Sequence, residues 1–230
     1  MRRTLRAFAA LLTYPNDELK AHMGEVRSAL QEEGTLARPA LRRLEPLLLR
    51  IEADDVLDSQ AAYSELFDRS RSLALHLFEH VHGESRERGQ AMVDLGETYA
   101  RHGLLMESEE LPDYVPAFLE FASCLPEAEA REMLGQPAHV FAALEERLGE
   151  RGSDYAPVFG AILAVAGAKP DGEALAELQQ AAPSDDISTI DEEWEEAPIA
   201  FTGPHDMGGP TGLVAKIRAA RKAAVAAKSA

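Results

Sequence analysis

The 230-residue sequence contains a single cysteine, Cys124. One cysteine excludes an intramolecular disulfide, and it also excludes a zinc site built from several cysteines. Unpaired cysteines are usually buried, and Cys124 ends an apolar helical pattern, so we expect it to be a small core residue. A lone reduced thiol fits a reducing cytosol.

Long hydrophobic runs are also missing, because no stretch of about 18 apolar residues occurs anywhere in the chain. The basic start Met1-Arg2-Arg3 resembles the beginning of a signal peptide, even a twin-arginine leader. The apolar stretch that follows, Ala7 to Leu12, is too short for a signal core. We therefore expect a first helix rather than an export signal, and a soluble cytoplasmic protein.

Motifs that carry catalysis are scarce. The sequence contains neither a GxGxxG nor a GxxxxGK[ST] phosphate loop, and it contains no GxSxG nucleophile elbow. One histidine-rich segment supplies His76, His80 and His82, which together support a second hypothesis, a metal-dependent hydrolase. The order HExxH is absent, and the more economical interpretation is that these polar side chains fix an ordered loop.

Aromatic residues make up only 6% of the chain, while Leu, Ala and Glu dominate, a mixture that favours helix over sheet. The formal net charge of −17 repels phosphate backbones, so nucleic acid is excluded as a partner. The same charge suits either plain solubility or a protein that holds a partly folded client. Charge alone does not separate these two interpretations.

Apolar side chains recur at helical spacing through residues 1–183, which predicts one compact all-α domain of about nine or ten helices. Asn16 is expected to cap the second helix and Asp113 to cap a later one. The expected helices lie at 5–12, 17–30, 41–51, around 63–67, 85–102, from about 113, 127–134, 137–149, 154–167 and 171–180. Between 68 and 85 Leu73, Leu75 and Leu77 alternate, so we expect a long ordered loop with extended pieces, of a length that is usually functional.

The C-terminal residues form three segments that differ in composition. Residues 184–197 are acidic, residues 198–212 are a Gly/Pro-rich linker, and residues 213–230 are a basic, Ala-rich tail. We expect the linker and tail to be flexible. The tail is interpreted as a solvated, frayed helix, with a contact to the acidic segment or to anionic lipid as alternatives.

Three blocks of sequence resemble a known family. They are Tyr-Ser-Glu-Leu-Phe-Asp-Arg at 63–69, Leu-Phe-Glu-His-Val-His-Gly-Glu-Ser-Arg-Glu-Arg-Gly-Gln-Ala-Met-Val-Asp-Leu at 77–95, and Glu-Leu-Pro-Asp-Tyr-Val-Pro at 110–116. In order and spacing they resemble the respiratory nitrate reductase assembly chaperones of the delta-subunit (NarJ) type, within the wider group of twin-arginine redox-enzyme chaperones. One departure is Tyr114, where the family usually has histidine. A role that needs a titrating imidazole there is in doubt, whereas packing or hydrogen bonding is still possible.

The resemblance implies a protein that is not an enzyme and has no cofactor of its own. Its partner would be the N-terminal segment of the nitrate reductase alpha subunit, within the alpha–beta complex of nitrate respiration. The family keeps that complex open for insertion of the molybdenum cofactor, which belongs to the client, and delays docking on the membrane cytochrome subunit. We expect the chaperone to be a monomer.

A third hypothesis is that the chain is a permanent structural subunit of a membrane complex.

The client is expected to bind as an amphipathic helix in a groove. We place this groove between the 63–67 helix, the 77–88 segment and the helix after residue 113. Apolar side chains would contact the client's apolar stripe, and acidic side chains would contact the basic residues that flank this stripe. Arg86 and Arg88 either contact the client or brace the loop through internal ion pairs, and these two alternatives have equal weight. The predicted client-binding residues are Tyr63, Phe67, Phe78, Glu79, His80, His82, Glu84, Arg86, Arg88, Glu110, Asp113 and Tyr114.

Overall fold

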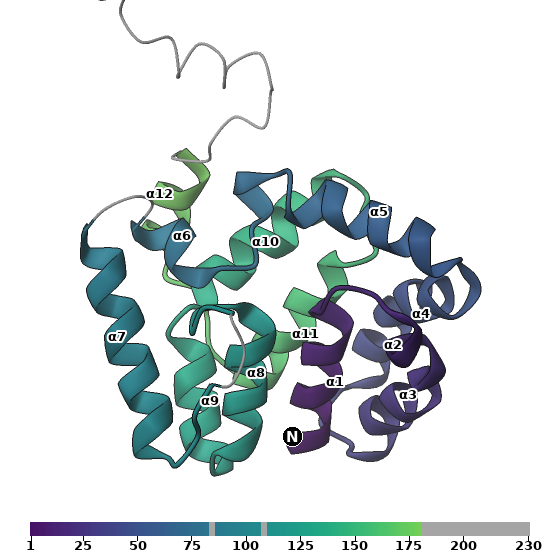
Figure 1. Cartoon of the computed structure of the whole chain (residues 1–230), viewed down its shortest axis with the longest axis horizontal. Coiled ribbons are helices and arrows are strands. Elements are labelled where there is room, and N and C mark those ends of the chain that lie inside the picture. The colour runs from purple at the N-terminus through teal and green to yellow at the C-terminus, as the bar shows by residue number, and fades with distance from the viewer. Residues whose placement is uncertain (83–85, 107–109, 181–230) are drawn as a thin grey trace, which may run out of the picture. The chain divides into compact units, whose positions relative to one another are not determined.

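The computed structural model describes residues 1–82, 86–106 and 110–180. Within these ranges the chain consists of helices and their connections, as Figure 1 shows, so the all-α prediction is confirmed. The helices are α1 (Arg2–Leu12), α2 (Asp17–Ala21), α3 (Met23–Glu32), α4 (Arg38–Ala53), α5 (Val56–Phe67), the short 3₁₀ helix η1 (Arg71–Leu73), α6 (Leu77–His82), α7 (Arg86–Arg101), α8 (Val115–Cys124), α9 (Glu127–Gly135), α10 (Ala138–Glu150), α11 (Ala156–Ala166) and α12 (Gly172–Gln180).

Two differences from the expected helices have local causes. The helix expected over 17–30 is divided at His22, which links α2 to α3, although Asn16 does cap α2 by accepting a hydrogen bond from the Leu19 amide. The long loop expected over 68–85 is wrong, because it contains η1 and α6. Gly103 follows α7 at a positive φ of 76°, as its place after the last helical turn predicts.

The core is built around α1, which packs against α3, α8 and α11. Leu5, Phe8 and Leu12, which recur at helical spacing along α1, are all completely buried. Burying one such side chain contributes about 1.5–3 kcal/mol relative to leaving it exposed. The helix predicted over 5–12 is therefore present, begins at residue 2 and lies at the centre of the core.

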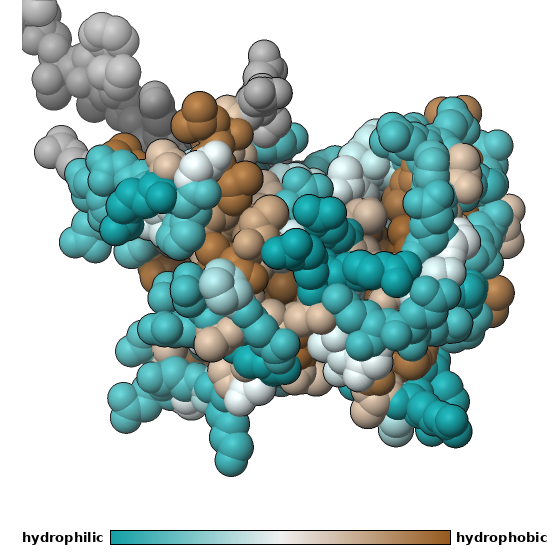
Figure 2. Space-filling model, turned by 90° about the horizontal axis from the view of Figure 1, so that it is seen from below, coloured by the Kyte–Doolittle hydropathy of each residue, from teal (hydrophilic) through white to brown (hydrophobic). Residues whose placement is uncertain are grey.

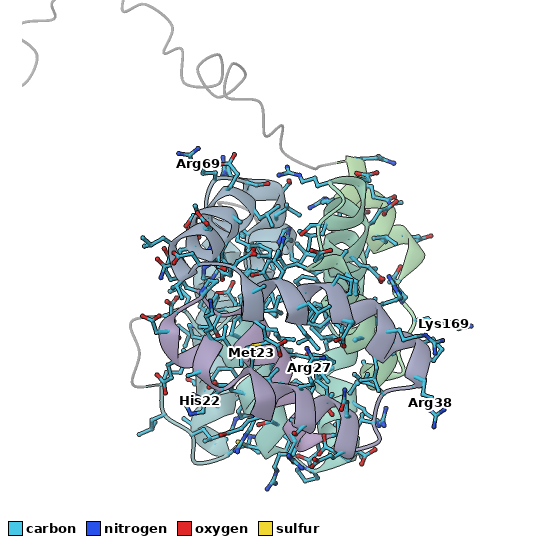
Figure 3. All side chains as sticks on the ribbon, turned by 90° about the vertical axis from the view of Figure 1, so that its right-hand side faces the viewer. His22, Met23, Arg27, Arg38, Arg69 and Lys169 are labelled. Carbon is cyan, nitrogen blue, oxygen red and sulfur yellow. The ribbon has the colours of Figure 1, made fainter. Side chains whose placement is uncertain are left out.

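Helices α2 to α4 cover one side of α1, the side that faces the viewer in Figure 3. Arg27 on α3 joins α3 to α4, because its guanidinium lies 2.6 Å from a carboxylate oxygen of Glu45 and 3.1 Å from one of Glu52. Met23 beside it is 2% exposed and anchors the start of α3 in the core. Packing and paired charges thus hold α3 and α4 together on this side.

Helices α9 to α12 form the other side, in which α11 packs against α4, α9 and α10. Phe141 of α10 and Phe159 of α11 are completely buried and lie 6.2 Å apart between ring centroids. No helix in the described ranges is long and apolar enough to span a membrane. The predictions for residues 184–197, 198–212 and 213–230 fall outside the described residues.

Candidate functional site

The connections before α6 and before α8 are joined by an isolated antiparallel bridge between His76 and Tyr114. The Leu77 amide donates to the Asp113 carbonyl at 3.1 Å, and the Val115 amide donates to the Leu75 carbonyl at 2.9 Å. The alternation of leucines in this region therefore does mark a short extended piece. Its partner lies 38 residues further along the chain, which is why no neighbouring strand is visible in the sequence.

Asp113 is completely buried under this bridge. Its Oδ2 accepts a hydrogen bond from the Phe78 amide at 2.9 Å, so it caps α6 and not α8. The cap predicted for α8 is wrong, because the N-cap residue of α8 is Tyr114, whose side chain makes no capping hydrogen bond to the helix. Oδ1 of Asp113 lies 3.5 Å from Nδ1 of His76, and neither atom has a hydrogen-bond partner among the described residues. Asp113 thus fixes the relative position of α6 and α8.

The histidines of α6 have structural partners. His80 donates from Nε2 to the Ala74 carbonyl at 2.8 Å, and burial, with a smaller contribution from Arg147, lowers its pKa to about 4 despite that hydrogen bond. His82 packs edge-on against Phe78 at 5.7 Å. Within the described ranges, no group of three or more His, Cys, Asp or Glu side chains is arranged to hold a metal ion.

A cavity of about 170 Å³ opens beside the bridge and is called here the aromatic pocket. It brings together four of the predicted residues with four others, and is lined by Tyr14, Tyr63, Phe67, Asp68, Leu75, His76, Glu110 and Tyr114. Tyr63 and Phe67 are 4% and 5% exposed, so they form its floor. The Tyr63 hydroxyl donates to the Leu12 carbonyl at 2.9 Å and lies 3.3 Å from the Tyr114 hydroxyl. Burial raises the pKa of both phenols, so both stay neutral at pH 7.

The other predicted residues lie elsewhere. Phe78 and Glu79 are half-buried on α6. Arg88 is half-buried on α7, and its Nε has no hydrogen-bond partner in the part of the chain that the structure describes. Glu84 and the side chain of Arg86 lie outside what the structure describes. The structure therefore gathers only part of the predicted set around one opening.

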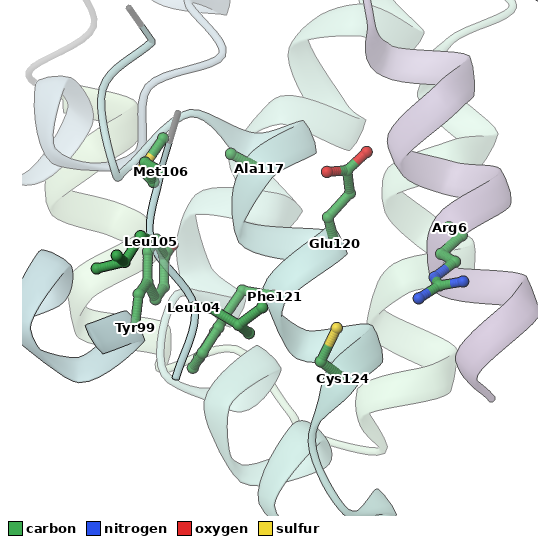
Figure 4. A pocket seen from close by; sticks show the side chains of 9 residues that line it. All are labelled: Arg6, Tyr99, Leu104, Leu105, Met106, Ala117, Glu120, Phe121 and Cys124. Atoms are coloured by element: carbon green, nitrogen blue, oxygen red, sulfur yellow. The ribbon is translucent and has the colours of Figure 1, made fainter. Parts of the chain in front are cut away.

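A larger cavity of about 580 Å³, called here the α8 pocket, was not predicted. Figure 4 shows α8 between Arg6 of α1 on one side and the 104–106 segment on the other. Its lining residues are Arg6, Tyr99, Leu104, Leu105, Met106, Ala117, Glu120, Phe121 and Cys124. The sequence signal for it was the apolar run 104–106 directly after Gly103, where a polar loop is normal. Cys124 is exposed here, so its predicted core position is wrong: it ends α8 on the side that faces the pocket.

Both pockets open along the same face of α8. Tyr114 lines the aromatic pocket, whereas Ala117 and Phe121 line the α8 pocket, and the spacing of three and seven residues places all three on one helical face. At about 1.5 Å per residue, Tyr114 and Phe121 are separated by about 10 Å, or two turns. A third cavity, of about 300 Å³, shares one lining residue with each of the other two, Glu120 with the α8 pocket and Tyr14 with the aromatic pocket. Figure 2 shows that apolar side chains gather in a hollow bordered by polar ones on the face that it draws.

Comparison with known proteins supplies the family. The sequence profile described as nitrate reductase delta subunit matches residues 17–161. The nitrate reductase molybdenum cofactor assembly chaperone NarJ of Escherichia coli K12 is 43% identical over 192 residues, which cover 83% of this chain and 81% of that protein. A probable chaperone of the same description, NarJ of Bacillus subtilis, is 30% identical and covers 70% of this chain and 86% of its own length.

A solved structure also matches. A crystal structure described as a redox enzyme maturation protein from Archaeoglobus fulgidus superposes with a TM-score of 0.53 at 22% identity, and covers 70% of this chain and 91% of its own. At that identity the match supports the fold alone. The profile and the relatives, by contrast, cover most of the sequence, so the chain belongs to the nitrate reductase delta subunit family, a family of assembly chaperones and not of enzymes.

Proposed function

We propose that this chain is a cytoplasmic assembly chaperone for one respiratory nitrate reductase. It binds the N-terminal segment of the alpha subunit within the alpha–beta complex, keeps that complex competent for insertion of the molybdenum cofactor, and delays its docking on the membrane subunit. The relatives named as molybdenum cofactor assembly chaperones support the class of client. The hydrolase alternative is set aside by the family.

The observation that carries peptide binding is the pair of pockets on one face of α8. The α8 pocket lies within the range of about 300–1,000 Å³ that is usual for ligand sites, while the aromatic pocket is smaller. A client helix laid along α8 would place apolar side chains in the larger pocket and reach the smaller one about two turns away. Leu105 is 80% exposed at the rim, where its apolar side chain is accessible to a client.

This geometry changes the roles proposed for the predicted residues. Tyr63 and Phe67 contribute the floor of the aromatic pocket, and Tyr114 and Glu110 its rim. Asp113 is completely buried, so we assign it an indirect role, that of holding α6 against α8. Phe78 and Glu79 on α6 remain candidates for direct contact.

The acidic character of the chain supports fast encounter with a basic client segment, because complementary charge raises association rates. Such a chaperone must also release its client, so moderate affinity is expected, with release driven by folding of the alpha subunit. We propose that it acts as a monomer and contributes no cofactor of its own.

The test is a calorimetric titration of the full chain with a synthetic peptide from the N-terminus of its alpha subunit. A peptide of the same composition in scrambled order is the matched control. The proposal expects saturable one-to-one binding of the native peptide, with a negative heat-capacity change from apolar burial, and none of the scrambled one. Equal binding of both peptides, or of neither, contradicts it.

Fractionation of cells separates this function from that of a permanent structural subunit. The proposal expects the chain with the alpha–beta complex before the cofactor is inserted, and not in the finished membrane enzyme. Stoichiometric presence in the purified membrane complex would favour the structural alternative. In cells that lack the chain, alpha–beta complex without cofactor should accumulate.

A further inference from the structure

The aromatic pocket has walls of a particular chemistry. Three tyrosine rings line it, those of Tyr14, Tyr63 and Tyr114. Tyr14 is 44% exposed and stands edge-on to Tyr63, with 5.5 Å between ring centroids. His76 lies against the Tyr114 ring at 5.5 Å. The face of an aromatic ring carries partial negative charge, so a cation that enters a pocket lined by several rings is attracted to their faces.

Two carboxylates, those of Asp68 and Glu110, share this opening. Neither forms an ion pair with any residue within the described part of the chain. The negative charges of both carboxylates reach the same phenol, that of Tyr114. Burial is the largest cause of its raised pKa, and the charges of Glu110 and Asp68 raise this pKa further. The pocket therefore has a negative potential that the surrounding described residues leave unneutralised.

We propose that the aromatic pocket binds one cationic side chain, an arginine or a lysine, of the client segment. This inference rests on the proposed function and adds the chemistry by which the client is recognised. The apolar face of the client enters the α8 pocket, and a basic residue about two turns away enters the aromatic pocket.

Size and hydrogen bonding both support this occupant. At about 170 Å³ the cavity is well below the size of ordinary small-molecule sites, about 300–1,000 Å³, and suits a single side chain. A guanidinium is planar, so it stacks on the tyrosine rings while its N–H groups donate to the two carboxylates. We therefore expect arginine to bind more tightly than lysine.

The experiment is a double-mutant cycle between chaperone and peptide. The chaperone variant is Asp68→Asn combined with Glu110→Gln, which keeps shape and removes both charges. The matched control is Asp58→Asn combined with Glu97→Gln, because these exposed acids line none of the three pockets described above and the change in net charge is identical. In the peptide, each basic residue is replaced in turn, arginine by citrulline and lysine by norleucine.

One basic position in the peptide is expected to stand out. Replacing it should weaken binding to the unchanged chain about tenfold, and the Asp68/Glu110 variant should show a similar loss with the native peptide. Combining the two changes should cost little more than either alone. The Asp58/Glu97 control should bind the native peptide within about twofold of the unchanged chain, since long-range attraction between exposed charges is screened by salt.

The outcomes distinguish the two proposals. If the peptide binds but its affinity is indifferent to Asp68 and Glu110, or falls equally for the control pair, this inference is wrong while the proposed function stands. If the unchanged chain binds no version of the peptide, the proposed function is contradicted and this inference with it. Circular dichroism verifies folding, and the two single variants replace the double one if it loses helicity.

Discussion

Asp113 caps helix α6 from 35 residues away in sequence, through a 2.9 Å hydrogen bond from the Phe78 amide to its Oδ2. The same residue directly precedes the N-cap residue of α8, so one buried carboxylate ties the start of α6 to the segment that leads into α8. This hydrogen bond explains how α8, whose outer face lines both pockets, keeps a fixed position relative to α6. It also explains why a side-chain acceptor oxygen stands at a position without access to solvent.

Replacing Asp113 by alanine should destabilise the fold, because the Phe78 amide is then left without its acceptor at the buried end of α6. The expected loss is about 1–3 kcal/mol of the free energy of unfolding. Asp113→Asn keeps an acceptor oxygen and should cost less. Urea denaturation followed by circular dichroism measures both; equal stability of the alanine variant and the parent would contradict the cap.

Tyr63 is a core residue as well as the floor of the aromatic pocket. Tyr63→Phe deletes the hydroxyl that donates to the Leu12 carbonyl and should cost about 0.5–1.5 kcal/mol. Tyr63→Ala leaves a cavity and should cost about 3–5 kcal/mol. Because the alanine variant risks unfolding, the phenylalanine variant is the one suited to binding measurements. Stability unchanged in both variants would show that this packing is wrong.

His80 should make stability depend on pH. Burial lowers its pKa from the ordinary 6.5 to about 4 in the folded chain, so between these values the unfolded state binds a proton that the folded state does not. Its contribution is fully present above about pH 6.5 and is lost as the pH falls towards 4. In His80→Gln the free energy of unfolding should therefore fall less steeply between pH 7 and 5. An identical slope in both proteins would refute this origin.

Leu105 tests the α8 pocket without disturbing the core. Because the side chain is 80% exposed, Leu105→Ser should change the free energy of unfolding by no more than about 0.5 kcal/mol. It should nevertheless weaken binding of the client peptide several-fold. The matched control is Leu49→Ser on α4, a leucine 53% exposed and outside all the pockets described. Equal losses in the two variants would point to general hydrophobicity and away from this site.

Helices were predictable from the sequence where apolar residues recur regularly at helical spacing. The helix expected from about residue 113 is present as α8, and its apolar residues Phe118 and Leu119 are buried. Failures occurred where the partner is distant in sequence: Asp113 looked like a local cap, and the histidine-rich segment looked like a loop, because the bridge between His76 and Tyr114 is invisible in the local pattern.

The candidate site was predictable only in part for the same reason. The motif blocks contain Tyr63, Phe67, Glu110 and Tyr114, and the fold brings these together in the aromatic pocket. The α8 pocket depends on the packing of α1 and α7 against α8, which no motif encodes. Its residues, Phe121 and Leu105 among them, look like ordinary apolar positions until that packing is known.

Photocrosslinking in cells tests the central claim, that the alpha subunit binds along the outer face of α8, most directly. A photoreactive amino acid is placed at position 105 or, as the control, at position 49, in cells that produce the nitrate reductase subunits. The account predicts that position 105 captures the N-terminal segment of the alpha subunit before cofactor insertion, and that position 49 does not. Capture at position 49 but not at position 105, or capture of a different part of the alpha subunit at 105, would contradict it.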